Sequence, residues 1–422
     1  MSISKYQFRM IPAIPGGSTF KSETESGGIS LANFRRIYFE DTMFKFFPYG
    51  EVYYIDQVGL ISDKLFFIEG MEFNVQIGYN EEQQENGSFT GGWLEHNYVW
   101  TEAQLNNIEP SNNINGDQIF ILLSKHYMTD RPQSGSFNNE SSQQKMTISD
   151  ILKKVYIPFF EIPKNKYFIS ETNGFPYLNQ YNDMNKDFIR KLTRAAYSTS
   201  FQQSPFYTFI NCNGEFYFMT IQELMNQQPV KDFIIDISPT SQMDDTYIKE
   251  YDTLHGGMPF NKENYLKRFY SFENAGVNIS EQENIHKMTD YKIDNENERL
   301  LVHKDFINKI PTDNVYLGIQ HQLDTPEYFS GFKNSFYADT NLSYRMTLMT
   351  QFDVRCVTGK TVTIQTTKKT QDDENAVEYS GRWLIIRSNH LLDKDGYPYS
   401  KLTIAKPKIR LDNNHPYRNN FQ

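Results

Sequence analysis

Two segments of this 422-residue chain have similar strand-like sequences, and this repetition constrains the fold more than any other feature. Gly70–Ile77 and Gly359–Thr366 both place apolar residues at the third and fifth positions after a glycine, and a glutamine follows. Such alternation buries one face of a strand. A second pair, Ile119–His126 and Trp383–His390, ends in Ser-x-His both times. Because the two matches occur in the same order, the sequence predicts one β unit that is present twice.

The interval between the matches is longer in the first copy than in the second. The segment 79–117, which is rich in Asn, Gln, Glu and Gly, is long enough to supply the extra residues. We interpret this segment as a loop insertion with one possible hairpin around Trp93 and Trp100. A first tube-like β domain is therefore expected over 29–127, and the Ser-, Gly- and Pro-containing residues 1–28 are expected to form an extended N-terminal arm.

The centre of the chain has helical patterns. Thr147 and Asp150 have capping-box spacing, which predicts a helix near 149–157 that Pro158 closes. A second helix is expected near 183–198 because apolar residues recur there at every fourth position, namely Met184, Phe188, Leu192 and Ala196. These helices predict a small α/β domain over 128–205.

Strand patterns return after this domain. Asn213-Gly214 separates two aromatic strands and predicts a tight hairpin turn with positive φ at both residues, and Asp395-Gly396 predicts another turn. The second tube-like domain is expected to comprise 206–240 and 342–410, with an inserted peripheral domain at 241–341 and a tail at 411–422. The predicted fold class is a β-rich α+β protein with two diverged antiparallel β-barrel tube-like domains, a small α/β domain between them and a large insertion.

Composition restricts the function classes. A formal net charge of -10 argues against tight binding of nucleic acid, since that affinity comes from Lys and Arg releasing counterions from phosphates. Such a balance still allows a polyanion to pass without sticking. Cys212 and Cys356 are too few for a disulfide framework or a structural zinc site. Since the chain has no apolar run of signal-peptide or membrane-span length, we expect a soluble protein made in the cytoplasm.

Several short motifs together resemble a known family. Gln180-Tyr181-Asn182 and Asp187–Leu192 are similar to the helix entry of bacteriophage tail hub proteins, including the T-even baseplate central hubs, and of the hub part of type VI secretion spike proteins. The aromatic hairpin 206–219 and the closing segments 380–390 and 397–405 follow in that family's order. One departure is that the chain ends soon after the second β unit, without the fused spike of the secretion proteins.

The resemblance implies a non-enzymatic, trimeric baseplate hub that adapts a sixfold tail tube to a threefold spike and surrounds the DNA channel. The implied partners are two further copies of the chain, the tail tube protein or tube terminator, a separate spike protein and neighbouring baseplate proteins. DNA would pass without specific binding, and no membrane, cofactor, metal or catalytic residue is implied. The implied location is the virion tail or baseplate, assembled in the host cytoplasm. Two similar units per chain would let three molecules present six near-equivalent faces whose strand edges pair around a ring.

Some residues suggest a nucleotide, metal or catalytic site, but each also has a structural interpretation, which we favour. Gly359-Lys360-Thr361 resembles the end of a phosphate-binding loop, but Val354 occupies the position where that loop needs glycine. His126 and His390 could form a metal or catalytic pair, yet they end the two matched strands and are expected to be structural. We expect two remaining groups to be solvated acidic clusters, namely Asp244-Asp245 and Asp372-Asp373-Glu374. We expect Cys212 to be an inert thiol.

Two other functions stay open from the sequence. A tail-tip cell-wall hydrolase would need paired carboxylates converging in a cleft, and hydrolysis of cell-wall material would reveal it. A carbohydrate-binding adhesin would use aromatic residues such as Trp93, Tyr98 and Trp100, and a glycan-binding assay would reveal this function. The simpler interpretation is that these aromatics form a small local hydrophobic cluster. Our hypothesis is that the insertion carrying these aromatics contacts a neighbouring baseplate protein.

Overall fold

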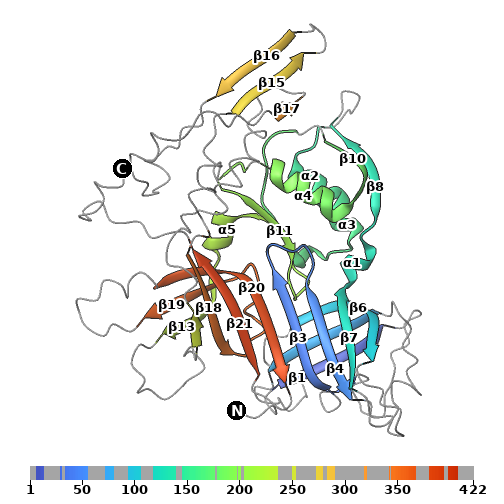
Figure 1. Ribbon diagram of the computed structural model, residues 1–422, viewed down its shortest axis with the longest axis vertical. Helices are drawn as coiled ribbons and strands as arrows, with labels where there is room; N and C mark the ends of the chain where they lie inside the picture. The colour runs from blue at the N-terminus through green and yellow to red at the C-terminus, as the bar shows by residue number, and fades with distance from the viewer. Residues whose placement is uncertain are drawn as a thin grey trace, which may run out of the picture.

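Figure 1 shows the computed structural model, in which a large sheet lies beside a smaller unit of helices and short strands. The structure describes the following residues: 6–13, 29–30, 34–55, 72–79, 94–105, 117–138, 145–175, 178–196, 198–200, 204–235, 250–252, 272–278, 283–289, 318–320, 342, 344–366, 380–393 and 398–406.

The large sheet has 13 strands drawn from both ends of the chain. Its first half consists of β1 (Tyr6–Ala13), β2 (Ile29–Ser30), β3 (Phe34–Thr42), β4 (Tyr49–Ile55), β5 (Glu72–Tyr79), β6 (Leu94–Leu105) and β7 (Asp117–Ser124). Its second half consists of β13 (Pro229–Ile235), β14 (Glu250–Asp252), β18 (Tyr344–Gln351), β19 (Thr361–Thr366), β20 (Gly381–Asp393) and β21 (Tyr399–Lys406). β3 and β4, in blue, lie next to β20 and β21, in orange (Figure 1).

The two halves of this sheet repeat one strand order. The first half runs β3-β4-β7-β6-β5-β1, and the second runs β14-β18-β21-β20-β19-β13. The strands correspond in chain order, and β5 and β19, which hold the matched residues Val75 and Ile364, occupy the same place in the two halves. Four of the neighbouring pairs are antiparallel in both halves, whereas β1 is antiparallel to β5 and β13 is parallel to β19. The predicted duplication is therefore present as a six-stranded unit.

The second sequence match is wrong in detail. Ile119–His126 lies in and just after β7, and Trp383–His390 lies in β20, but the repeated order makes β7 the counterpart of β21 and β20 the counterpart of β6. β7 and β20 both contain a run of apolar residues, so residue types alone matched two strands that are not counterparts. A shared irregularity supports the corrected correspondence, because the register shifts between Thr101 and Ala103 in β6 and between Ile385 and Arg387 in β20.

Two predicted loops contain strands of this sheet. β1 lies in the segment expected to be an extended arm, and it pairs with β5 along its whole length. β6 lies in the segment 79–117 expected to be a loop insertion, and it pairs with both β5 and β7. The sequences of β1 and β6 contain few β-branched residues, so intrinsic strand preference does not predict these strands. They form because neighbouring strands of the sheet supply their hydrogen bonds.

The smaller unit lies between the two halves in sequence. Its elements are α1 (Lys125–Thr129), β8 (Pro132–Phe137), α2 (Ile148–Ile151), the π-helical turn η4 (Leu152–Tyr156), α3 (Ile157–Phe159), the 3-10 turn η5 (Lys164–Lys166), β9 (Tyr167–Ile169), β10 (Leu178–Met184), α4 (Asn185–Ala195), β11 (Phe206–Ile210), β12 (Phe216–Thr220) and α5 (Ile221–Asn226).

Both predicted helices of the smaller unit are present. Thr147 caps α2 as expected, since its hydroxyl oxygen accepts a hydrogen bond from the Asp150 N–H over 3.2 Å. Pro158 does not close the helix itself, because it lies in α3, which directly continues the π-helical turn η4, and Phe159 is the last helical residue. α4 begins after β10 and buries Phe188 and Leu192, two members of the predicted apolar series.

The aromatic hairpin is also present, but it belongs to the smaller unit rather than to the second tube-like domain. β12 pairs with β11 on one side and with β9, in parallel, on the other. The turn is wider than the predicted two-residue turn, because Gly214 has φ 70° while Asn213 does not have positive φ. The side-chain oxygen of Asn211 accepts hydrogen bonds from the backbone N–H groups of Asn213 and Glu215 and so shapes this turn.

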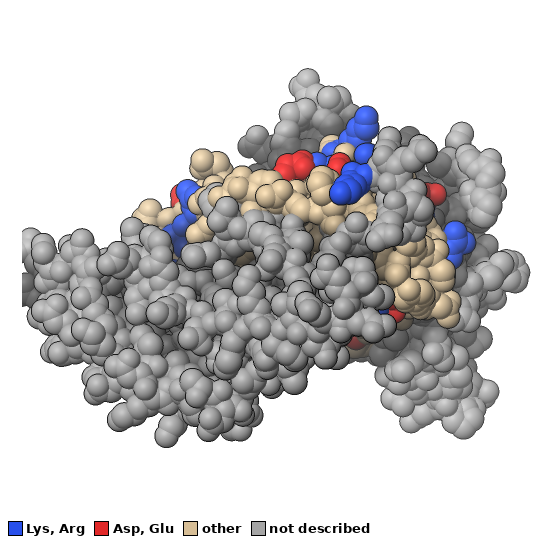
Figure 2. Space-filling view, turned by 90° about the horizontal axis from the view of Figure 1, so that it is seen from above, with Lys and Arg blue, Asp and Glu red and all other residues tan. Residues whose placement is uncertain are grey.

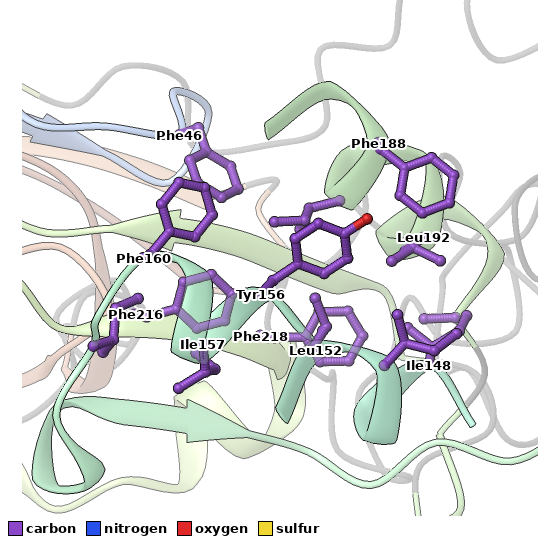
Figure 3. Packing of buried hydrophobic residues seen from close by; sticks show 14 of the residues in the cluster. Phe46, Ile148, Leu152, Tyr156, Ile157, Phe160, Phe188, Leu192, Phe216 and Phe218 are labelled. Carbon is purple, nitrogen blue, oxygen red and sulfur yellow. The ribbon is translucent and has the colours of Figure 1, made fainter. Parts of the chain in front are cut away.

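Figure 3 shows the core of the smaller unit. Phe188, Leu192, Tyr156 and Phe218 are fully buried and point toward one another from α4, η4 and β12. Burial of each such side chain contributes about 1.5–3 kcal/mol, so this core stabilises the unit substantially. The Tyr156 hydroxyl donates a hydrogen bond to the Gln180 side chain over 2.7 Å, which satisfies the buried polar end of the ring.

Three further observations concern the expected peripheral domain and barrels. β14 lies inside 241–341 but pairs with β18 of the large sheet, whereas β15 (Phe272–Asn278), β16 (Glu283–Thr289) and β17 (Gly318–Gln320) form a separate three-stranded sheet. Within the residues that the structure describes, no sheet closes into a barrel, so the barrel part of the fold prediction is not observed. In the same residues, no helix is long and apolar enough to cross a membrane.

Candidate assembly interface

The two halves of the large sheet meet where β3 pairs with the second part of β20. The antiparallel register extends from Arg387 opposite Thr42 to Asp393 opposite Arg36. At the far end, the Arg36 guanidinium contacts the Asp393 carboxylate at 3.1 Å, and near the other end Arg387 contacts Glu40 at 3.1 Å. This internal joint makes one continuous sheet from two copies of the same unit.

A buried carboxylate ties this joint to the smaller unit. Asp41 of β3 is 1% exposed, and its side chain accepts hydrogen bonds from the Thr358 hydroxyl at 2.6 Å, from the Ser388 hydroxyl and from the Cys212 backbone N–H at 2.8 Å. Thr358 precedes β19, Ser388 lies in β20, and Cys212 lies in the turn of the aromatic hairpin. A buried ion costs several kcal/mol unless hydrogen bonds compensate it, and here donors from three segments provide that compensation.

Close packing reinforces the contact between the units. Gly359 has φ +90°, and a side chain there would meet the Phe209 ring at 2.8 Å. Lys360 next to it bonds the Glu215 carboxylate over 3.0 Å and lies above the Tyr217 ring at 5.7 Å. The segment that resembled the end of a phosphate-binding loop is therefore a turn that packs on the smaller unit, and Thr361 begins β19 as predicted.

A second anchor comes from the turn between β3 and β4. Phe46 leaves the large sheet and points toward Phe160 and Phe216 in the core of the smaller unit (Figure 3). Its carbonyl oxygen accepts a hydrogen bond from the Ile210 N–H over 2.8 Å. Phe46 is 2% exposed, whereas Phe44 in the same turn is 51% exposed. The smaller unit is thus fixed to the first half through Phe46 and to the second half through Gly359.

The sheet face opposite the Asp41 side carries polar side chains, and several of its charges are paired. Tyr38 and Tyr49 donate hydrogen bonds over 2.7 Å to Glu40 and Glu51. Burial would raise the pKa of Glu40, but the Tyr38 hydroxyl together with the Arg387 and Lys45 cations lowers it below its ordinary value. The neighbouring positions on this face, by cross-strand register, are Arg36, Tyr53, Asn389, Leu391, Asp393, Lys401 and Thr403. We refer to all these residues as the polar face.

The smaller unit shows the same balance of charge. Lys191 contacts Asp183 at 2.8 Å, and Lys153 contacts Glu171. Figure 2, seen from above, shows acidic and basic side chains lying next to one another among uncharged residues. Such mixed surfaces produce no strong single-sign field.

The two histidines do not form a site together. His126 lies in α1 and its ring packs edge-on against Phe160, whereas His390 lies inside β20 and its Nδ1 is 2.8 Å from the Ser400 hydroxyl. Burial, with the nearby Lys125 cation, lowers the pKa of His126 to about 4, and burial also lowers the pKa of His390. The expectation that they end equivalent strands is wrong, because β7 and β20 are not counterparts.

The remaining candidates have mixed outcomes. Cys212 is fully buried, and burial raises the pKa of the Cys356 thiol. Tyr98 and Trp100 lie in β6, so they belong to a strand rather than to a loop. Within the described residues, no three His, Cys, Asp or Glu side chains gather as metal ligands would. The acidic clusters, Trp93 and Asp395-Gly396 lie outside the described residues.

Sequence reasoning missed Asp41, which organises the joint. A single aspartate in an aromatic strand has no spacing pattern, although an acidic residue at a core-facing position of Phe34–Thr42 was a usable signal. It also missed the polar face, because its Tyr-Glu pairs become visible only when the strand register is known.

No protein-family model matches the chain, and no curated protein sequence matches it. Solved structures do. A tail protein from Neisseria meningitidis MC58 has a TM-score of 0.54 at 10% identity, covering 96% of this chain and 98% of that one. The 43 kDa tail protein of prophage MuSo2 from Shewanella oneidensis has a TM-score of 0.47 at 10% identity, covering 95% and 98%.

A type VI secretion component from E. coli, itself similar in structure to tail proteins of bacteriophage T4, has a TM-score of 0.43 at 8% identity, covering 90% of this chain and 76% of that one. The resemblance to tail hub proteins that the sequence motifs indicated is confirmed among these structural neighbours. Over nearly its whole length, this chain has the same fold as the tail protein from Neisseria meningitidis.

Proposed function

We propose that the chain is a structural hub of a phage tail or baseplate, in which three copies form a ring that matches a sixfold tube. The observation that carries this proposal is the six-stranded unit that occurs twice in the same strand order. A chain with two such units converts threefold symmetry into a near-sixfold surface without a second gene product. The fold shared with a tail protein over nearly the whole of both chains supports the same conclusion.

The ring would surround a channel for DNA, and the polar face is the part of the sheet suited to line it. Two of its cations are held by neighbouring carboxylates, Arg36 by Asp393 and Arg387 by Glu40. A wall with paired charges offers few free cations to phosphates, so DNA would pass without being retained. The chain acts through burial of interfaces and not through catalysis, and it resides in the virion tail.

The partners we propose are the tail tube protein or tube terminator on one side, a separate spike protein on the other, and neighbouring baseplate proteins at the periphery. The test is native mass spectrometry of the purified full chain, alone and after mixing with a purified candidate spike protein. We expect a mass of three chains, and three chains plus a spike trimer in the mixture. A stable mass of two or six chains, or cell-wall hydrolysis by the purified protein, would contradict the proposal.

A further inference from the structure

The motif Gln180-Tyr181-Asn182 lies in β10, which pairs with β8 in a two-stranded ribbon at the right-hand margin of the smaller unit in Figure 1. Gln180 points inward and is 2% exposed, whereas Tyr181 points outward and is 76% exposed. An aromatic ring with so much of its surface in water is costly unless another molecule covers it. The ribbon therefore presents a tyrosine side chain whose role the fold itself does not explain.

A β-bulge at Asn182 aims Tyr181 outward. The register shifts between Tyr181 and Asp183, so Asn182 is the extra residue, and its φ of 54° lies in the left-handed region that side chains other than glycine seldom adopt. The Gln180 amide holds the bulge from inside, because its Nε2 donates a hydrogen bond to the Asp183 carbonyl oxygen over 2.8 Å, while its Oε1 accepts one from the Tyr156 hydroxyl. Bulges often re-aim a side chain for function, so the direction of Tyr181 is a built feature of the ribbon.

Two hydrogen bonds also orient the exposed ring. The Asn179 Nδ2 donates to the Tyr181 hydroxyl oxygen over 2.8 Å, and the Ser136 hydroxyl donates to the Asn179 Oδ1 over 2.6 Å. A side chain that is already held in one orientation loses less conformational entropy when it binds a partner. Tyr181 is thus pre-organised for contact even though most of it is in water.

The exposed side chains around the ring are uncharged and can form hydrogen bonds. We refer to them together with the ring as the Tyr181 face, which consists of Ser134, Ser136, Asn179, Tyr181 and Asn182. The only charged residue of β8 and β10 is Asp183, and it is paired with Lys191 at 2.8 Å. A face without cations does not attract a polyanion such as nucleic acid. Tyr, Ser and Asn are instead the residues with which antibody paratopes recognise protein surfaces.

We propose that the Tyr181 face docks a different protein of the tail, and that Tyr181 is its anchor, inserted into an apolar pocket rimmed by uncharged hydrogen-bonding groups. This inference rests on the proposed tail role but not on the ring. The face belongs to the smaller unit, which occurs once in the chain, whereas the proposed ring is built from the duplicated sheet. Assembly of copies through that sheet leaves the face to another protein. A protein pocket encloses the whole exposed ring, whereas a sugar covers only one side of it.

Photo-cross-linking in assembled tails identifies the partner. Benzoylphenylalanine replaces Tyr181 in the full chain or, as a control, replaces Phe44, an exposed aromatic residue outside the face. After irradiation of purified tails, mass spectrometry should find position 181 joined to one other tail protein and position 44 not joined to that protein. A cross-link from position 181 only to another copy of this chain, to no protein, or to the same protein as position 44 overturns the proposal. If the chain itself is missing from purified tails, the tail role fails as well.

Titration calorimetry of the full chain with the cross-linked protein, purified, then tests the anchor. Tyr181→Ala should weaken binding by about 30-fold or more, as the loss of an anchor residue does. Asn179→Ala, which releases the ring, should weaken it by about 3–10-fold. Lys154→Ala, at an exposed position of the same unit outside the face, should leave the affinity unchanged.

Tyr181→Ala should unfold at the same temperature as the unmodified chain, because the side chain is 76% exposed, so a loss of binding would not reflect a loss of folding. Equal affinity of Tyr181→Ala and the unmodified chain overturns the proposal. Binding of the unmodified chain to a glycan array that Tyr181→Ala abolishes also overturns it, since the face would then recognise carbohydrate.

Discussion

Thr358 donates its hydroxyl hydrogen bond to the carboxylate of Asp41 over 2.6 Å, although the two residues belong to opposite ends of the chain. Asp41 lies in the first six-stranded unit, and Thr358 lies in the turn before β19 of the second. The Cys212 N–H from the smaller unit reaches the same carboxylate. One buried anion thus connects the three parts of the fold, and its removal should weaken all of them together.

Asp41→Asn replaces an acceptor that serves several donors with an amide whose NH2 group faces either the Cys212 N–H or the Thr358 and Ser388 donors. We expect the free energy of unfolding to fall by about 2–4 kcal/mol, because buried donors lose their charged partner. Urea denaturation at pH 7 measures the change. Glu51→Gln on the polar face is the control and should change stability by about 0.5 kcal/mol or less. Equal stability of Asp41→Asn and the unmodified chain would show that Asp41 is not the organising group.

Gly359→Ala should destabilise the contact between the second unit and the smaller unit. The new methyl group would meet the Phe209 ring at 2.8 Å, and φ +90° is unfavourable for any residue with a side chain. Gly381→Ala is a matched control, since φ is +107° there but nothing lies within 4 Å. We expect a loss of about 1–2 kcal/mol for Gly381→Ala and clearly more for Gly359→Ala. Similar losses in thermal unfolding would mean that the ring contact is unimportant.

Phe46→Ala tests the anchor between the β3–β4 turn and the smaller unit. Removing a buried phenyl ring costs about 3–5 kcal/mol, and we expect Phe46→Ala to lower stability by this amount. Phe44→Ala removes the same group from the same turn, but Phe44 is 51% exposed, so its loss should be below about 1 kcal/mol. If the two variants unfold at the same urea concentration, Phe46 does not anchor the units.

The stability of the chain should fall in mild acid through its buried histidines. The pKa of His126 is lowered from its ordinary value of 6.5 to about 4, so the unfolded state binds the proton more readily than the folded state. Stability from this group is present above pH 6.5 and is lost as pH falls toward 4, by about 3 kcal/mol in all. His126→Gln should flatten this part of the pH profile of unfolding. An unchanged slope between pH 6.5 and 4 would assign the acid sensitivity to other groups.

The sequence predicted the organisation of the sheet better than its boundaries. The match of Val75 with Ile364 identified true counterparts, because alternation around a glycine reports which face of a strand is buried. The match of β7 with β20 failed because both strands contain a run of apolar residues, which does not identify a strand's place in the sheet. β1 was missed, and β6 was indicated only by the possible hairpin around Trp93 and Trp100, because their pairing depends on strands that are distant in sequence. The hairpin at Asn213-Gly214 was local and was found, but its partner β9 was not, since a parallel neighbour leaves no local signal.

The central claim is that two copies of one unit in each chain let three molecules act as six. Electron microscopy of the assembled full chain, averaged without imposed symmetry, tests it most directly. The account predicts a ring of three molecules with six similar lobes, so that sixfold features appear at low resolution and only threefold symmetry remains at high resolution. A ring of six molecules, or a threefold ring with three lobes only, would contradict it.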